Sequence, residues 1–391
     1  MTKLINPCFT YTSLWCLYFC QGILYPSGSV ISQGLAFIIF ILSLIYTVKY
    51  LLSQHLSGYQ LALFSVLTLV TIYGCVAFIT DGTVIKGQSY DTSLFAWFKN
   101  LYLSILPIFT YLYFAKNEYL SKQFVIKMLP MILVSVLVSY YWAYNSANQL
   151  MLMNNAVESD GVTNNAGYLI VSIIPLFLVI DKNKLLQYTL LLLSMMLIVF
   201  AMKRGAILIG TILTILFLLR NFKQASFRFK IIIILLNIGL FYIIYYFIDN
   251  YMLSNQYFLG RVEEVVSGKS SGRDNIYSTL WQYFNHNADF FSKLFGGGVW
   301  FTTKICYTSA HNDWFEFLLD MGLLGVTIYL YYWISFSKLL IKKDLPGPSV
   351  FCLTLIFINL FMKTLFSMSL DTMTYIQGMM IGLSYYGLLK K

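Results

Sequence analysis

Residues 30–52 read VISQGLAFIIFILSLIYTVKYLL and carry a single charged side chain, that of Lys49. A helix of roughly 20 mostly apolar residues crosses a bilayer core about 30 Å thick, so this stretch predicts a membrane-spanning helix. Further apolar runs of this kind are bounded by polar, Pro or Gly clusters. Together they predict about twelve spans, at residues 8–25, 30–52, 59–80, 93–115, 123–144, 164–180, 185–202, 205–219, 231–248, 313–336, 349–369 and 371–388.

The composition of the chain favours the same class. Of its 391 residues 59% are hydrophobic and 11% are charged, against about 25% charged in an ordinary globular protein. The mean hydropathy is +0.71. These values exclude a soluble globule and predict an all-α, polytopic membrane protein in which residues 1–391 form a single transmembrane domain.

The positive charges separate by side of the membrane. If the N-terminus is inside, the inner segments hold sixteen of the 26 Lys and Arg residues, and thirteen of the sixteen acidic residues lie outside. Because Lys and Arg are held on the cytoplasmic side, we expect both termini to be cytoplasmic. The net charge of +10 is then mainly a topology signal, and no nucleic-acid partner is predicted.

One connection is much longer than the others. Residues 249–312, between the ninth and tenth spans, form a polar loop on the predicted outer side, and long loops in compact proteins usually carry function. The amphipathic stretch NIYSTLWQYF, Asn275 to Phe284, predicts a helix that lies over the membrane.

Common cofactor and metal motifs are absent from the sequence. It has no GxxxxGK[ST], HExxH or CxxC motif and no GxGxxG after a strand, and its three histidines are far apart. Glu158 and Asp160 form the only closely spaced acidic pair that resembles a metal-diphosphate motif, and we interpret them as part of a solvated outer loop. The run Gly296 to Gly298 indicates a turn. We therefore predict neither a cofactor nor a metal.

Two outer segments carry arginines in positions suited to phosphate. Lys203 and Arg204 separate two apolar runs, where they either snorkel to the interface or, through Arg204, offer a planar fork to a phosphate. Arg273 follows a glycine in the long loop, and it either binds a phosphate or pairs with Asp274 or Glu264.

The third segment begins at His311, where the loop enters a helix. The positive end of the helix dipole disfavours an imidazolium, so His311 suits a general base; the alternative is an interfacial polar residue without chemistry. Asn312, Glu316 and Asp320 are spaced to share one helix face, and we expect that face to look onto protein or water. Gly322 and Gly325 predict close packing of a neighbouring helix.

These segments resemble the bacterial O-antigen ligase and polymerase family. The similarity lies in an HN…E…G…G pattern from His311, in KRGA at 203–206 and GRDNIY at 272–277 in the same order, and in Asn164-Asn165-Ala166-Gly167 followed by Pro175. It covers roughly residues 150–335, and the flanking spans match only in hydropathy.

The resemblance implies a metal-independent, inverting glycosyltransferase at the periplasmic face of the bacterial inner membrane. Its substrates would be undecaprenyl-diphosphate-linked oligosaccharides, with membrane lipids and a chain-length regulator as further partners. Arg204 and Arg273 would hold the donor diphosphate, and His311 would accept the proton of the acceptor hydroxyl. Apart from the resemblance, Asn312, Glu316 and Lys203 are candidate supporting residues. Lys363, near an outer helix end, either extends the diphosphate site or, as we expect of a lysine there, snorkels to the interface.

Three functions fit this sequence. The MKRGA context and the hydropathy favour a polysaccharide polymerase, which adds the growing chain to one lipid-linked repeat unit. An O-antigen ligase would transfer the glycan to lipid A–core instead. A flippase or other transporter would also suit twelve spans, but no repeated half is visible, and the candidate residues gather at one face.

Overall fold

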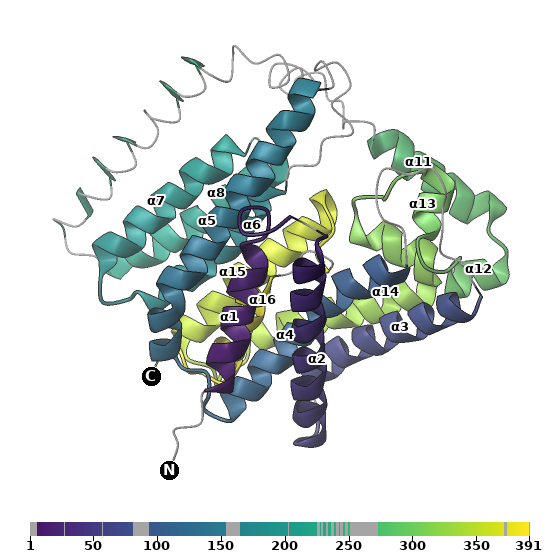
Figure 1. Ribbon diagram of the computed structural model, residues 1–391, viewed down its shortest axis with the longest axis horizontal. Helices are drawn as coiled ribbons and strands as arrows, with labels where there is room; N and C mark the ends of the chain where they lie inside the picture. Colours follow the sequence, from purple (N-terminus) through teal and green to yellow (C-terminus); the bar gives the residue numbers. More distant parts are fainter. Residues whose placement is uncertain are drawn as a thin grey trace. The chain divides into compact units, whose positions relative to one another are not determined.

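The computed structural model describes residues 6–26, 28–56, 58–80, 94–153, 165–201, 203–224, 273–370 and 374–390, with scattered positions between 227 and 250. These residues form helices joined by turns, with no strand among them (Figure 1). Six of the helices are long and apolar enough to cross a membrane, as expected of a multi-pass membrane protein. They are α2 (Val30–Leu52), α3 (Tyr59–Ile79), α5 (Lys122–Met153), α8 (Arg204–Gln224), α14 (Asp313–Leu340) and α15 (Gly347–Phe366).

The remaining predicted spans that the structure describes are also helical, with different bounds. They are α1 (Pro7–Phe19), α4 (Leu94–Lys116), α6 (Ala166–Ile173), α7 (Lys184–Phe200) and α16 (Tyr375–Tyr385). The predicted first span ends early, at Phe19. After α6 the chain tightens into the 3₁₀ helix η2 (Ile174–Val179), where Pro175 offers no N–H to an α-helical ladder. The ninth predicted span lies largely outside the described residues, so the count of twelve stays a prediction.

The chain divides into two compact units. The first contains residues 1–15, 33–122 and 272–391, and the second contains residues 16–32 and 123–271. In the first unit, α16 packs closely on α4, because Gly378 and Gly382 have no side chain to hold the helices apart. A Cβ at Gly378 would lie 3.2 Å from the backbone nitrogen of Ile108, and one at Gly382 would lie 2.8 Å from the carbonyl oxygen of Tyr111.

Aromatic side chains fill the contact between α14 and α15. Trp333 of α14 lies edge-on to Phe357 and Phe361 of α15, with ring centroids 5.5 and 5.2 Å apart. Phe336, also on α14, packs on Phe357 of α15 at 5.4 Å and on Tyr59 of α3 at 4.9 Å. Edge-to-face aromatic pairs contribute about 0.5–1.5 kcal/mol beyond the area they bury, so these contacts fix α14 between its neighbours.

Residues 273–312 of the long loop are folded and belong to the first unit. They form α11 (Arg273–Gln282), the π-helix η4 (Tyr283–Asn287), α12 (Phe290–Phe295) and α13 (Phe301–Cys306), drawn in green in Figure 1. The predicted helical structure of Asn275 to Phe284 is thus confirmed, as α11 followed by η4, and its place over the membrane stays a prediction. A small separate buried core consists of Leu280 in α11, Ala310 before α14, and Leu319 in α14.

Helix α14 is broken near its start. Gly322 has a φ of 68°, in the left-handed region, and therefore interrupts the α-helix. The amides of Gly297 and Gly298 donate to the carbonyls of Leu319 and Asp320 at 2.8 and 2.9 Å, which satisfies groups that the break frees. We call Gly296, Gly297 and Gly298 the glycine clasp.

The clasp and the break approach each other backbone to backbone. A Cβ on Gly322 would collide with the backbone of Leu294, and one on Gly296 would collide with the backbone of Asp320. The close packing predicted at Gly322 is therefore present, but the neighbour is the loop rather than another membrane-spanning helix. Gly325 instead faces Met321, on the other side of the break.

Candidate functional site

His311 lies in a strained turn directly before α14. Its φ is 50°, in the left-handed region that non-glycine residues seldom adopt. Such a conformation persists only where the surroundings fix it. Asn312 is the N-cap of α14, and its side chain accepts hydrogen bonds from the amides of Trp314 and Phe315 at 2.9 and 3.4 Å. The helix start therefore fixes one side of the turn.

Glu316 fixes the other side of the turn. Its carboxylate is buried, and Oε1 accepts a hydrogen bond of 2.6 Å from the amide of Ala310, the residue before His311. Oε2 accepts a hydrogen bond from the hydroxyl of Thr302 in α13. Because a charged acceptor strengthens both bonds, Glu316 ties the His311 turn to α13.

Thr302 also connects Glu316 with Asp320. The Thr302 side chain is fully buried, and its amide donates to Oδ1 of Asp320 at 3.1 Å. One residue of α13 thus contacts two carboxylates of α14. The sequence offers no signal for Thr302, because a threonine in an apolar loop helix has no distinctive pattern.

Asp313 is a further buried carboxylate of the site. It accepts the amide of Ser369 at 3.0 and 2.9 Å through its two oxygens, and the hydroxyl of Tyr329 at 2.7 Å. Sequence reasoning missed it, because an acidic residue in a first helical turn usually only complements the helix dipole. Its partner Ser369 follows α15 and lies far away in the sequence, and Tyr329 lies beyond the break in α14.

These contacts correct the predicted polar face of α14. Asn312 is the N-cap of the helix, and its side chain is directed to the amides of Trp314 and Phe315. The buried carboxylates are instead those of Asp313, Glu316 and Asp320. The expectation that the acidic face looks onto protein is confirmed by their hydrogen bonds.

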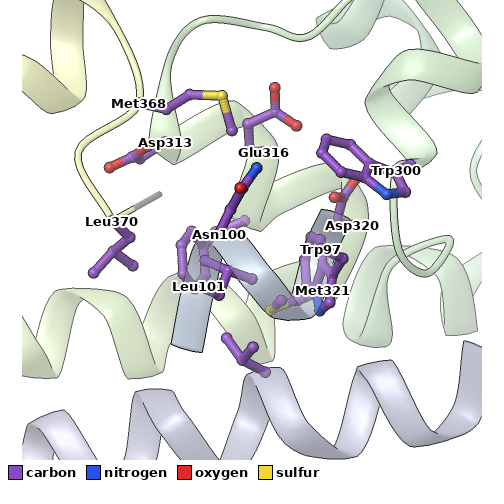
Figure 2. A pocket seen from close by; sticks show the side chains of 12 residues that line it. Trp97, Asn100, Leu101, Trp300, Asp313, Glu316, Asp320, Met321, Met368 and Leu370 are labelled. Atoms are coloured by element: carbon purple, nitrogen blue, oxygen red, sulfur yellow. The ribbon is translucent and has the colours of Figure 1, made fainter. Parts of the chain in front are cut away.

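The acidic face of α14 lines a pocket (Figure 2). The pocket holds about 540 Å³ of empty space, its open mouth included. Trp97 and Asn100 of α4 and Trp300 of the loop form other parts of its wall, and the two indole rings meet edge-on at 5.8 Å. In Figure 2 the amide of Asn100 points toward the side of the pocket that holds Glu316.

Arg273 lies at the same end of the first unit as His311. It begins α11, and its Nη1 donates to the carbonyl of Phe366, the last residue of α15, at 3.0 Å. That bond takes one of the five N–H donors of the guanidinium. Tyr277, one turn along α11, stacks on Phe315 with ring centroids 4.9 Å apart, and this brings α11 against the start of α14.

The residues that follow His311 reach the same stretch of chain. Nε1 of Trp314 donates to the hydroxyl of Thr364 at 3.0 Å, and Asp313 accepts the amide of Ser369. Residues 364–369 therefore connect the start of α11, which carries Arg273, with the start of α14, which follows His311. Lys363 lies one residue before this stretch and is 6% exposed, so its side chain lies within the protein rather than snorkelling into water.

The imidazole of His311 has a polar neighbour within the turn. Its Nδ1 lies 3.4 Å from the hydroxyl of Ser309, which is itself largely buried. If the ring carries its proton on Nδ1, that hydrogen bond leaves Nε2 as the basic atom.

The pKa of the Cys306 thiol depends on the negative charge of the site. Cys306 ends α13, and burial together with the negative charge of Glu316 raises its pKa above that of an ordinary thiol. Within the described ranges, no three His, Cys, Asp or Glu side chains are grouped so that they could hold a metal ion.

Arg204 belongs to the second unit. It is exposed and begins α8 directly after the tight turn from α7. The start of α6 packs on this turn, since a Cβ on Gly167 would lie 2.9 Å from the Cβ of Ala206 and 3.6 Å from that of Lys203. Lys203 and Ala206 of the KRGA segment thus lie close to Gly167 of α6.

Some predicted positions cannot be placed. Gly272, Glu158, Asp160 and Glu264 lie outside the described residues. The structure thus groups His311, Glu316, Arg273 and Lys363 in the first unit, and Lys203 with Arg204 in the second.

Comparison of the sequence with models of known protein families finds no match, and comparison with curated proteins finds no similar one.

Proposed function

We propose that this protein is a polysaccharide polymerase, which transfers a growing undecaprenyl-diphosphate-linked glycan onto a lipid-linked repeat unit. The observation that carries the proposal is the link through residues 364–369, which ties the Arg273 end of α11 to the His311 turn. A planar cation and a potential base held at one end of a unit suit the removal of a diphosphate together with the activation of a hydroxyl.

The reaction that this arrangement suits is a single inverting displacement. The acceptor hydroxyl oxygen attacks the anomeric carbon of the donor glycan from the face opposite the diphosphate. The bond from that carbon to the phosphate oxygen breaks, and undecaprenyl diphosphate leaves with the electron pair. Nε2 of His311 takes the proton of the hydroxyl, and Arg273 stabilises the negative charge on the departing diphosphate.

The surroundings of His311 support its role as the base. The turn lies at the start of the first segment of α14, before the break at Gly322, and the positive end of this segment opposes protonation of the imidazole. The hydroxyl of Ser309 would accept a hydrogen bond from Nδ1 and so keep Nε2 basic. The bonds of Glu316 and Asn312 hold the backbone around the imidazole in place, as a base that must act at a set distance requires.

The cellular setting is part of the proposal. A lipid-linked diphosphate substrate calls for a bacterial inner membrane, with the His311 turn on the periplasmic side and both termini in the cytoplasm. The distribution of Lys and Arg over the predicted loops supports this orientation. Arg204 is proposed as a second diphosphate ligand on the strength of the family resemblance.

Reconstitution with defined substrates tests the function. Purified protein in liposomes is incubated with undecaprenyl-diphosphate repeat units, and the products are separated by length. We expect a ladder of lengthened chains with the wild type and with His286→Ala, which changes an exposed histidine of the same loop. His311→Ala should give no ladder while inserting normally. An undiminished ladder from His311→Ala would refute the assignment of the base.

The same assay separates the other functions. Transfer to lipid A–core without lengthening would identify a ligase. Movement of the lipid-linked unit between leaflets without any new glycosidic bond would identify a transporter. Loss of the ladder in Arg204→Ala, with normal insertion, is expected if Arg204 binds the diphosphate.

A further inference from the structure

The short helix α12 exposes aromatic side chains that no other described element covers. Phe290, Phe291 and Phe295 are 73%, 69% and 46% exposed, and the rings of Phe290 and Phe291 meet edge-on at 5.7 Å. Trp281, on the preceding α11, is 51% exposed and stacks on Phe284. We call Trp281, Phe290, Phe291 and Phe295 the aromatic surface. So many large exposed rings in one loop mark an interaction site.

The apolar residues of α12 lie on one side of the helix. At about 100° per residue, Phe290, Leu294, Phe291 and Phe295 fall within an arc of about 140°. Ser292 and Lys293 occupy the rest of the turn. The ammonium of Lys293 donates to the carbonyl of Asn285 at 3.0 Å and lies over the ring of Phe284, so its charge is directed back toward η4. The helix is amphipathic despite its length.

A contact with α3 shows how far α12 lies from the end of this membrane-spanning helix. The hydroxyl of Tyr73 in α3 donates to the carbonyl of Phe295, and it lies 3.3 Å from the carbonyl of Met321. Tyr73 is six residues before Ile79, the end of α3, which corresponds to about 9 Å along the helix axis. Side chains on a helix lean toward the helix N-terminus, which for α3 is the end away from Ile79. The Tyr73 hydroxyl therefore lies no nearer to Ile79 than the Tyr73 backbone does.

The surface of α3 at this depth is apolar and exposed. Ile72, Val76 and Phe78 of α3 are 53%, 53% and 74% exposed, as lipid-facing residues of a span would be. α12 lies beside this end of α3 (Figure 1), so its aromatic surface continues the lipid-facing surface of a membrane-spanning helix. The other end of α12 is capped by Asp289, which is fully exposed; hydrogen bonds from Ser292 lower its pKa, so it stays ionised in water.

From this geometry we infer that α12 is a membrane anchor, whose phenylalanine side chains insert among the acyl chains at the edge of the leaflet that adjoins the loop. Apolar aromatic rings on one face and charge on the other are the features of a helix that lies in the interface. Trp281 suits the headgroup level, where indoles are enriched.

The anchor has a consequence for the site. α12 leads directly into the glycine clasp, which donates two hydrogen bonds to the break in α14. By holding α12 at the membrane surface, the lipid fixes the distance of the clasp, α13 and the His311 turn from the bilayer. We expect replacement of Phe290 and Phe291 by Ser to loosen the loop from the membrane without unfolding the spans.

Radical footprinting of the intact protein in phosphatidylethanolamine and phosphatidylglycerol nanodiscs tests the anchor. Oxidation of each residue is measured by mass spectrometry relative to the same peptide free in water. Phe37, 63% exposed on the apolar span α2, is the lipid reference, and His286 of η4 is the dose reference in the loop. We expect Phe290 and Phe291 to be protected as strongly as Phe37. Oxidation of these phenylalanines at the level of the free peptides would overturn the inference.

Spin labelling distinguishes lipid from another protein as the covering partner. The six cysteines are replaced, and a single cysteine is introduced as Phe291→Cys or, for comparison, as His286→Cys. At position 291 we expect collisions with oxygen to exceed those with a water-soluble nickel chelate, and at 286 the reverse. Low accessibility of position 291 to both reagents would show a protein contact and contradict the anchor. Neither measurement depends on enzymatic activity, so the anchor and the polymerase can fail separately.

Discussion

Removal of the Glu316 carboxylate tests the link between the fold and the proposed base. Glu316→Ala leaves the amide of Ala310 and the hydroxyl of Thr302 without their buried acceptor. Each buried group that loses its partner costs about 1–3 kcal/mol, so the expected loss of stability is about 2–6 kcal/mol. This is a large part of the 5–15 kcal/mol that typically stabilises a domain.

The activity should fall by more than the stability loss alone would cause. Without Glu316 the turn is free to leave the left-handed conformation of His311. A displacement of a catalytic group by about 1 Å can reduce the rate about 10²-fold. We therefore expect kcat of the proposed glycan transfer to drop at least about 10²-fold in the reconstituted protein, with KM nearly unchanged, since Glu316 positions the proposed base rather than the substrate.

The amide variant provides the rescue. In Glu316→Gln the carboxamide oxygen still accepts from Ala310, and its NH₂ group donates to Thr302, whose hydroxyl can reverse its role. Only charge assistance is lost, about 1 kcal/mol per bond. Asp289→Asn, an acid-to-amide change at an exposed cap of the same loop, is the matched control. Wild-type kcat and thermal stability in Glu316→Ala would refute the reasoning, and a change confined to KM would indicate direct contact with substrate.

Three other predictions concern the neighbourhood of the turn. Gly322→Ala should lower the free energy of unfolding by at least about 1–2 kcal/mol, because an L-residue is strained at positive φ. Gly34→Ala is the control, since a Cβ there would meet no other atom. Equal melting temperatures of the two variants would contradict the break in α14. Arg273→Lys should abolish the ladder if the guanidinium fork binds the diphosphate, and retained activity would favour a point charge. The alkylation rate of Cys306 should rise only above the pH typical of a thiol, and Glu316→Gln should lower that midpoint; an unshifted pH–rate profile would deny the contact.

The helices could be predicted because lipid leaves the chain little choice. An apolar run must satisfy its backbone groups internally, so runs such as 30–52 and 349–369 are helical almost at the expected bounds. The helix at 275–284 could be predicted from its amphipathic pattern. The break at Gly322 could not, because a glycine in an apolar run is equally compatible with close helix packing. The amides of Gly297 and Gly298, which are far from Gly322 in the sequence, show that the helix is broken there.

The candidate site was predicted in its components but not in its connections. His311, Arg273 and Glu316 stand out because charged or basic side chains at span ends need a reason. Residues 364–369, which link them, contain no group that a motif search would select. Asp313 and Thr302 escaped for the same reason, since their importance lies in partners that only the fold supplies.

The break in α14 explains how three carboxylates can stand at the start of a membrane-spanning helix. A carboxylate at the centre of a span costs about 2.5–3.5 kcal/mol, which would oppose insertion of a continuous helix from Asp313 to Leu340. The break at Gly322 makes this cost unnecessary. Residues from Leu323 to Leu340 are still within the 17–25 that cross a bilayer, so the segment from Asp313 to Met321 need not enter it as a span. It is held by α13, by the clasp, by the chain after α15 and by Tyr329 of the spanning part of α14, and these satisfy its carboxylates. A polar turn can thus be placed at the level of the membrane edge, where the proposed lipid-linked substrate would present its diphosphate, because the protein supplies the partners that the bilayer cannot.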